Sequence, residues 1–449
     1  MTDAAAPASP AIRDGSLFAP DAHTRRRNAA ERRFRAYGIT AVALSILALI
    51  VLLVSVLGNG AGAFRQTFIQ IPVTIDAKIV DPKGNRALDE MKKVTTIGYG
   101  KQLEASMLAA VAAAGVATDG LSRKDIAGLL SKEAAAGLRG MVLENPDLIG
   151  RTITFRALAN GRIDGYFKGR VSMDSAKLDS NISPAQLVLA ERLRDAGLVT
   201  VAFNPQFLLG ADASEVRPEA AGLGVAILGS AYMMIIVLVL ALPLGVAASI
   251  YLEEFAPKNR WTDLIEVNIA NLAAVPSIVY GILGLAIFIN TLGLPQSAPI
   301  VGGLILTLMT LPTIIIATRV SLAAVPPSIR DAALGVGASR MQAVFHHVLP
   351  LALPGILTGT IIGMARALGE TAPLLLIGMV AFVREFPAAP PEGFFSPASA
   401  LPVQVYNFTQ RADPAFVERA SGAIIVLLVF LICMNAAAII LRRRFERRW

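Results

Sequence analysis

Residues 222–252 read GLGVAILGSAYMMIIVLVLALPLGVAASIYL, a run of 31 residues that contains no charged side chain. A helix needs about 20 consecutive, mostly apolar residues to cross a bilayer, so this run predicts a transmembrane helix. The whole chain of 449 residues agrees, since 54% of it is hydrophobic and 16% is charged, against about 25% charged in an average globular protein. This composition excludes intrinsic disorder and argues against an ordinary soluble enzyme.

Five further stretches share this apolar character, so the sequence predicts six spans in all. The others are 37–57, 264–290, 298–318, 351–383 and 421–441. The first is longer than the roughly 7–15-residue core of a signal peptide, which favours an uncleaved anchor. A cleaved first segment stays an alternative, because Ala61-Gly62-Ala63 resembles a cleavage site.

Arginines at both ends predict the orientation, because short cytoplasmic flanks of membrane helices are rich in Lys and Arg. Six arginines cluster within 12 residues before the first span and five follow the last: Arg25, Arg26, Arg27, Arg32, Arg33, Arg35, Arg442, Arg443, Arg444, Arg447 and Arg448. Six crossings also place both termini on one side, so we expect both to be cytoplasmic. The net charge of +8 then reflects orientation in a lipid bilayer, and no nucleic-acid partner is expected.

Residues 59–221 differ from the rest, because they hold 20 Lys and Arg and 18 Asp and Glu. Apolar and polar residues alternate over 69–79, which predicts a half-buried strand. Asn160-Gly161 separates two alternating runs and predicts a hairpin. Ser-Pro-Ala-Gln at the start of 183–197 predicts a helix with serine as its N-cap. We therefore expect an α/β domain outside the membrane, with no catalytic constellation.

The predicted fold class is an all-α polytopic membrane protein of six transmembrane helices with an inserted extracytoplasmic α/β domain. Its parts are a basic tail (1–36), a first helix (37–58), the inserted domain (59–221), a five-helix core (222–441) and a second basic tail (442–449).

The loop between the fourth and fifth spans carries a distinctive motif, DAALGVG at 331–337 followed by HVLP at 347–350. Small residues make a narrow helix that another protein can approach closely. Gly337 permits a sharp turn, and Pro350 suits the first turn of the next helix. From these residues alone, a helix that docks into a partner's groove and a loop that merely packs both remain open.

The spacing of this motif resembles the cytoplasmic coupling loop of ABC-importer permeases, Glu-Ala-Ala-x3-Gly-x9-Ile-x-Leu-Pro. Here Asp331 stands in place of glutamate and His347 in place of isoleucine. In that family the loop docks into a cleft on a separate ATPase subunit. The resemblance implies that the loop 328–350 contacts an ATPase through six residues: Asp331, Ala332, Ala333, Gly337, Leu349 and Pro350.

Three more stretches, YLEEF at 251–255, AVPSIVYG at 274–281 and ARALGETAPLL at 365–375, are similar to permeases of phosphate-specific ABC importers. The last is closer in form to the PstA family than to the PstC family. The resemblance covers about 222–441 and implies a permease of the bacterial inner membrane that moves inorganic phosphate by alternating access. The partners it implies are a PstC-like second permease subunit, a dimer of ABC ATPases and an extracytoplasmic phosphate-binding protein.

Arg366 and Glu370 are the charged residues inside the fifth apolar stretch. A charge at the bilayer centre costs about 2.5–3.5 kcal/mol, so such residues usually face a cavity or each other. Their i,i+4 spacing places them within mutual reach. They are either a self-neutralising pair or a site where Arg366 binds an oxyanion through its planar fork while Glu370 orients it. The family resemblance favours the second reading.

Two weaker candidates lie nearby. Arg319, at the inner end of the fourth span, could belong to the substrate pathway, although an ordinary positive-inside anchor explains it more simply. Gly355, Gly359 and Gly363 recur every four residues and predict a helix-packing seam, against a neighbouring helix or a second permease subunit.

The motifs that the sequence lacks limit its chemistry. It contains no G-x-x-x-x-G-K-[ST], H-E-x-x-H or G-x-S-x-G motif, so we expect a non-catalytic subunit whose ATPase is another polypeptide. One cysteine and three histidines predict no metal site, and no cofactor is expected. The alternatives are a permease for another oxyanion such as sulfate or phosphonate, a membrane-anchored sensor with 59–221 as its sensing domain, and an intramembrane enzyme, which the missing motifs disfavour.

Overall fold

The structure is a computed structural model that describes residues 22–380 and 382–445. The chain divides into two units, 1–55 and 56–449. Most of α1 (Ala22–Gly60) belongs to the first unit, and this single helix contains the predicted first span. Residues 1–21 of the predicted N-terminal tail and 446–449 of the C-terminal tail lie outside the described residues.

Several helices of the described chain are long and apolar enough to cross a membrane. There are five of them within the described ranges, or six if one bent helix pair counts as a single span. Besides α1 they are α11 (Gly224–Ile250), α14 (Pro299–Ala323), α17 (Leu349–Gly369) and α20 (Ala415–Phe445). The predicted spans at 222–252, 298–318 and 421–441 are therefore helical.

The third predicted span is the bent pair. It consists of α12 (Arg260–Ala273) and α13 (Ser277–Gly284), with a π-helical extension over Leu285–Thr291. The two helices meet at 99°. Pro276 causes the break, because a proline lacks the amide donor and disfavours helical backbone in the residue before it. The Tyr280 hydroxyl donates to the Leu272 carbonyl at 2.8 Å and so satisfies a carbonyl near the end of α12.

The fifth predicted stretch, 351–383, is also divided. The helix α17 ends at Gly369, Glu370 is extended, and a short helix α18 (Ala372–Leu376) follows. Pro373 explains where α17 ends, because its ring would clash with the carbonyl of the residue four positions earlier, which is Gly369. Residue 381 of this stretch lies outside the described residues.

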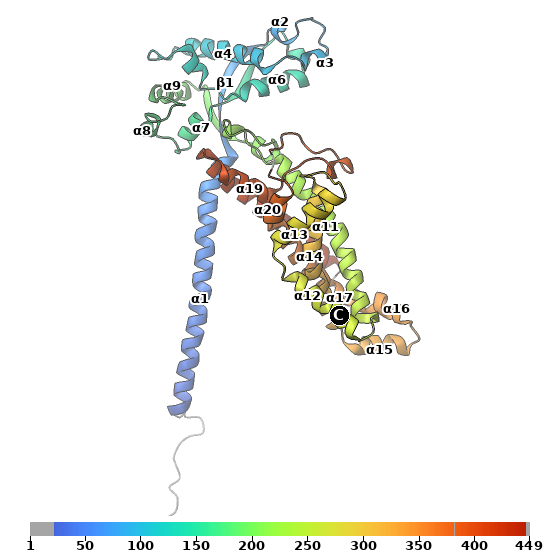
Figure 1. The fold of residues 1–449 in the computed structure, drawn as a ribbon. Coiled ribbons are helices and arrows are strands. Elements are labelled where there is room, and N and C mark those ends of the chain that lie inside the picture. The colour runs from blue at the N-terminus through green and yellow to red at the C-terminus, as the bar shows by residue number, and fades with distance from the viewer. Residues whose placement is uncertain (1–21, 381, 446–449) are drawn as a thin grey trace, which may run out of the picture. The chain divides into compact units, whose positions relative to one another are not determined.

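The helix α14 packs against both α11 and α17. The Ser249 hydroxyl of α11 donates to the Ile315 carbonyl of α14 at 3.0 Å, and Met233, a few turns earlier, lies against Gly302. Because later residues of α11 contact later residues of α14, the two helices run in the same direction. They are drawn side by side in Figure 1.

The helix α17 runs in the opposite direction, because Gly355 lies against Ser321 and Gly363 lies near Thr310. As a result, the segment that connects α14 to α17 lies at the opposite end of these helices from the N-terminus of α11. That connection consists of α15 (Pro327–Gly335), α16 (Arg340–Ala343) and a π-helical turn, Val344–Val348.

Residues 61–221, here called the sheet domain, are built around a three-stranded antiparallel sheet in the order β2-β1-β3. The strands are β1 (Arg65–Thr74), β2 (Thr152–Leu158) and β3 (Val199–Phe203). Its longer helices are α4 (Thr96–Ala113), α6 (Ala134–Glu144), α7 (Gly161–Phe167) and α9 (Pro184–Asp195). Together they enclose a hydrophobic core with fully buried Tyr99 and Leu138.

Two of the three local predictions for this domain are confirmed. The first strand is β1, with Ile69, Ile71 and Val73 buried, although the chain turns helical after Asp76. The helix at 183–197 is α9, and Ser183 forms a capping box at its N-terminus. The hairpin at Asn160-Gly161 is wrong, because β2 pairs with β1 and residues after Asn160 form α7.

The reason for that error is local. The Asn160 side chain accepts a hydrogen bond from the amide of Arg162 at 2.9 Å and caps α7. Asparagine followed by glycine suits a hairpin turn, and asparagine is equally favoured as a helix N-cap.

The glycines of α17 provide a matched test of the packing. A Cβ on Gly359 would lie 2.2 Å from the Ala317 Cβ, whereas a Cβ on Gly363 would meet Ile314 at an ordinary 3.6 Å. We expect Gly359→Ala to lower the midpoint of thermal unfolding, because overpacking a filled contact costs about 1–3 kcal/mol. Gly363→Ala should unfold like wild type, and equal midpoints for both variants would contradict this packing.

Candidate functional site

Arg366 and Glu370 lie together at the end of α17. The Arg366 Nε is 3.8 Å from the Glu370 Oε1, and the two side chains are 50% and 20% exposed. At this distance the guanidinium and the carboxylate form an ion pair but no hydrogen bond. The guanidinium therefore keeps donors that a further acceptor could use.

The segment after Glu370 packs against α13. A Cβ on Gly281 would lie 2.7 Å from the Pro373 Cα, so the two backbones are in direct contact. This contact joins the stretches 274–281 and 365–375, which are far apart in the sequence. Tyr280, next to Gly281, is buried. The two stretches are therefore in contact close to Arg366, which is half exposed.

Arg319 is held very differently. Its Nε lies 3.2 Å from the Glu253 Oε2, and its Nη2 lies 2.7 Å from the Glu266 Oε1. Glu253 lies in the π-helical turn Tyr251–Phe255 after α11, and Glu266 lies in α12. Arg319 thus links α14 to two neighbouring elements, and these carboxylates occupy much of its hydrogen-bonding capacity.

Arg330, which is not among the predicted site residues, holds the connecting segment against the membrane helices. It donates to both carboxylate oxygens of Glu254 over 2.6–3.2 Å and to the carbonyls of Leu322 and Val325 at 2.8 and 2.7 Å. Glu254 is nearly buried. The available signal was the pair of adjacent glutamates in YLEEF, which have no basic residue next to them in the sequence.

The six predicted coupling residues lie in α15, in the turn that follows it and at the start of α17. Gly337 has φ +91°, a left-handed conformation that favours glycine, and it separates α15 from α16. Asp331 and Ala332 are exposed on α15, whereas Ala333 is buried. Leu349 and Pro350 form the first turn of α17. Half of the predicted residues are therefore exposed, and the other half lie on the buried side of α15 or at the start of α17.

Four large apolar side chains that are close to this turn in the sequence are exposed. Val336 is 86% exposed, and three other large side chains near it are also exposed: Leu334, Met341 and Phe345. These four side chains are not among the predicted coupling residues, which are mostly small. An exposed apolar cluster on a short helical turn is typical of a protein-binding surface.

The three glycines of the stripe face α14 of the same chain. Cβ atoms on Gly355 and Gly359 would approach Ser321 and Ala317 to within 2.3 and 2.2 Å. The stripe thus permits close approach of two helices within this subunit.

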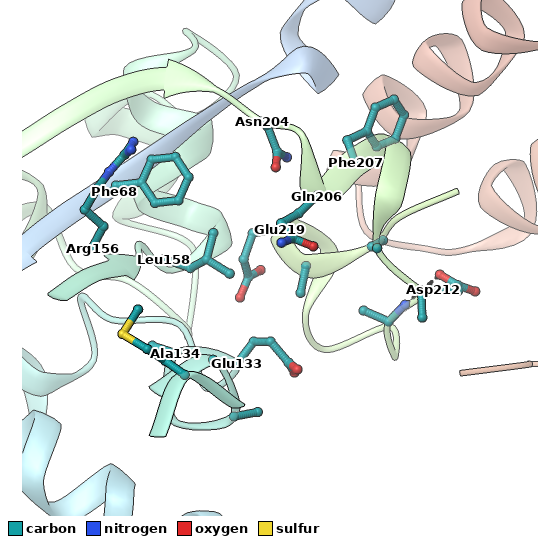
Figure 2. Close-up of a pocket in the computed structure, with 18 of the residues that line it drawn as sticks. Phe68, Glu133, Ala134, Arg156, Leu158, Asn204, Gln206, Phe207, Asp212 and Glu219 are labelled. Atoms are coloured by element: carbon teal, nitrogen blue, oxygen red, sulfur yellow. Dashed lines mark hydrogen bonds between the residues drawn. The ribbon is translucent and has the colours of Figure 1, made fainter. Parts of the chain in front are cut away.

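A cavity of about 510 Å³ lies beside the sheet domain, lined partly by Phe68, Phe207 and Glu219 (Figure 2). Its other carboxylates are paired, Glu133 with Arg217 and Arg384, and Asp212 with Arg411. Burial raises the pKa of Glu219 above its usual range.

The cavity does not suit an anion. Two cations line it, but Arg156 is stacked over the Phe68 ring at 4.4 Å and Arg384 is paired with Glu133 at 3.2 Å. Three carboxyl groups also lie on the walls. Over the described residues, no group of three or more His, Cys, Asp or Glu side chains could hold a metal ion.

Comparison with known proteins identifies the class. The family described as "Binding-protein-dependent transport system inner membrane component" matches residues 241–449, and a domain of unknown function (DUF3333) matches residues 21–177. A probable ABC transporter permease, YqgI of Bacillus subtilis, is 34% identical over 49% of this chain and 78% of its own length. The chain belongs to this family of inner-membrane permeases.

Within the family it is a PstA-like permease. The phosphate transport system permease PstA 1 of Mycobacterium tuberculosis is 32% identical over 52% of this chain and 75% of its own length. PstA of Xylella fastidiosa is 31% identical over 50% and 77%. An inward-facing methionine ABC transporter covers 50% of this chain and 95% of its own at 17% identity, with a TM-score of 0.38 that adds nothing to the assignment.

Arg330 supplies a direct test of how the connecting segment is held. In Arg330→Gln, Glu254 loses its cation and two carbonyls lose their donor. Hydrogen bonds to charged groups contribute about 1.5–3 kcal/mol each, so we expect residues 324–343 to open more readily and proteinase K to cleave them faster. Arg340→Gln removes the same charge from an exposed position of the same segment and should not change the rate. Equal rates for both variants would contradict the role of Arg330.

Proposed function

We propose that this chain is the membrane-spanning permease subunit of an ATP-driven importer of inorganic phosphate. The observation that carries the proposal is the similarity to PstA permeases over about three quarters of their length. The family match over residues 241–449 includes α13, α14 and α17, and with them Arg366 and Glu370. In this role the chain is a non-catalytic subunit, and ATP is hydrolysed by a partner.

Arg366 and Glu370 are the proposed pathway residues. Arg366 is half exposed and its ion pair is long, so its planar fork can donate hydrogen bonds to two phosphate oxygens for a short time. Glu370 holds the guanidinium in place and competes with the anion, which keeps binding weak enough for release. Arg319 joins the pathway only in a state in which its pairs with Glu253 and Glu266 have opened.

The segment 328–350 is the proposed coupling element. Asp331, the exposed small residues of α15 and the apolar cluster around Val336 form a surface that fits a groove on an ABC ATPase. The Arg330–Glu254 pair then transmits movement of α15 to the end of α11. Each of the two ATPase subunits would bind one such segment, the first from this chain and the second from a PstC-like partner.

Orientation follows from the arrangement of the helices. If the coupling segment is cytoplasmic, the N-terminus of α11 and the sheet domain that precedes it belong on the outer side. Both termini are then cytoplasmic, in agreement with their arginines. The sheet domain would face the compartment of an extracytoplasmic phosphate-binding protein, where it could contact that protein or regulate access to the path.

Phosphate uptake tests the proposed pathway. In cells that express the complex at normal levels, we expect Arg366→Gln and Glu370→Gln to lower phosphate uptake, the first by about tenfold or more. The physical reason is the loss of a charge-assisted interaction of about 1.5–3 kcal/mol. Arg123→Gln, at an exposed arginine of the sheet domain, serves as the control. Full uptake by both pathway variants would exclude this site.

Co-purification tests the coupling segment. Gly337→Val places a β-branched residue at φ +91° and should distort the turn. Asp331→Lys reverses an exposed charge on α15. We expect both variants to lose the ATPase subunit on purification, whereas Gly335→Ala, where a Cβ meets nothing within 4 Å, should retain it. An unchanged complex in both variants would show that another surface binds the ATPase.

A further inference from the structure

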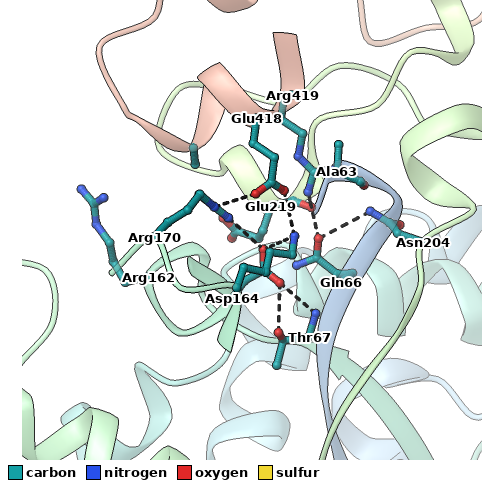
Figure 3. Close-up of polar contacts among 12 residues, drawn as sticks. Ala63, Gln66, Thr67, Arg162, Asp164, Arg170, Asn204, Glu219, Glu418 and Arg419 are labelled. Carbon is teal, nitrogen blue, oxygen red and sulfur yellow. Dashed lines mark hydrogen bonds and ion pairs between the residues drawn. The ribbon is translucent and has the colours of Figure 1, made fainter. Parts of the chain in front are cut away.

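One buried side chain of α20 joins both ends of the sheet domain. Arg419 is 2% exposed and donates to the Ala63 carbonyl at 3.2 Å, the Gln66 Oε1 at 2.8 Å and the Glu219 carbonyl at 3.0 Å (Figure 3). Ala63 and Gln66 lie where the chain enters the sheet domain, and Glu219 lies where it leaves. A single guanidinium thus holds the entry and exit segments against the same helix.

The neighbouring residue of α20 contacts the interior of the sheet domain. The Glu418 Oε1 lies 3.0 Å from the Lys168 Nζ, and its Oε2 lies 2.6 Å from the Arg170 Nε. Both cations also pair with Asp164 of α7, at 2.6 and 3.3 Å. Glu418 and Asp164 are almost fully buried, so these pairs are shielded from water.

The network continues to the central strand of the sheet. The Asp164 Oδ1 accepts hydrogen bonds from the amide and the hydroxyl of Thr67, at 2.9 and 3.0 Å. Because Thr67 lies in β1, an uninterrupted chain of polar contacts runs from α20 through α7 to the sheet.

Close backbone contact leaves little room for sliding at this junction. A Cβ on Gly422 would lie 2.6 Å from the Ala63 Cβ and 2.9 Å from the Phe207 ring. A Cβ on Gly62 would lie 2.8 Å from the Glu418 carboxylate. The Arg419 guanidinium also lies over the Phe207 ring, 5.1 Å from its centroid.

A second contact extends the junction to the preceding helix, α19 (Leu401–Gln410). Arg411 follows α19 and donates through Nη1 to the Asp212 Oδ1 at 3.0 Å and to the Ala213 carbonyl at 2.9 Å. Its guanidinium lies near two aromatic rings, those of Phe408 and Phe416, at 5.2 and 4.6 Å from their centroids. The exit segment of the sheet domain is therefore held at two places.

The electrostatics of the junction make partial opening costly. Burial lowers the pKa of Lys168, against the opposing effect of Asp164, and burial raises the pKa of Glu219. Removing one member of such a network leaves another charge buried without a partner, which is far less favourable than the intact network. The buried network therefore disfavours partial opening of the junction.

We propose that this cluster, Asp164, Lys168, Arg170, Glu418 and Arg419, is a rigid joint through which the sheet domain and the N-terminal end of α20 move as one body during transport. Arg419 is its main positioning residue. Any partner that moves the sheet domain then acts directly on a membrane helix. The inference rests on the proposed function only in assuming that the permease helices move during a transport cycle.

Spin-label distances test the joint in the complete complex. Cys433, the single native cysteine, is replaced by serine, and labels are placed at Leu178→Cys in the sheet domain and Val417→Cys in α20, which are 92% and 60% exposed. Electron–electron double resonance is recorded without nucleotide and after trapping with ATP and vanadate. We expect one narrow distance distribution with the same maximum in both states. A shift of the maximum between the states would overturn the proposal.

Variants show whether this cluster is responsible. We expect Arg419→Gln to broaden the distribution, and the milder Glu418→Gln to do so if Arg419→Gln does not assemble. Glu215→Gln, at an exposed glutamate near the junction, should leave it narrow. Narrow distributions in both cluster variants would overturn the proposal. The distances do not depend on which ion is carried, so failure of the joint and failure of the phosphate assignment are distinguishable.

Discussion

Close packing around α14 is the constraint on which the membrane part of this protein depends. Within a bilayer, lipid tails are as apolar as the helices, so helices associate through tight contact and hydrogen bonding. α14 meets α11 at Gly302 and α17 at Gly355 and Gly359. It also holds α12 through Arg319, and the carbonyls at its C-terminal end receive Arg330. The candidate pathway and the coupling segment are both positioned from this one helix.

Three arginines near these helices differ in how closely carboxylates hold them. This difference distinguishes a structural role from a functional one. Arg319 and Arg330 are each held by short contacts to carboxylates, whereas Arg366 has a single long contact and remains half exposed. All three have the same charge, and each lies in a membrane helix or next to one. The difference lies in glutamates that are remote in the sequence, and it makes Arg366 the one of the three best suited to bind an anion briefly.

The apolar spans, the strand at β1 and the capped helix α9 could be predicted because each depends on local periodicity or on one capping residue. The bend at Pro276 and the end of α17 before Pro373 interrupt apolar stretches that hydropathy alone predicts as continuous, although both prolines stand in the sequence. The Arg330–Glu254 pair and the Arg419 cluster could not be predicted. Their partners are 76 and up to 356 residues apart, and one sequence carries no information about such contacts.

If this chain forms the phosphate path of an ATP-driven importer, the purified complex must transport phosphate across a membrane. The measurement is uptake of radiolabelled phosphate into proteoliposomes that contain this chain with its permease partner, ATPase and binding protein, with and without excess unlabelled sulfate. A phosphate importer should show accumulation that requires ATP and the binding protein and that persists in sulfate. Absence of accumulation, or its loss when sulfate is added, would show that this chain does not form such a path.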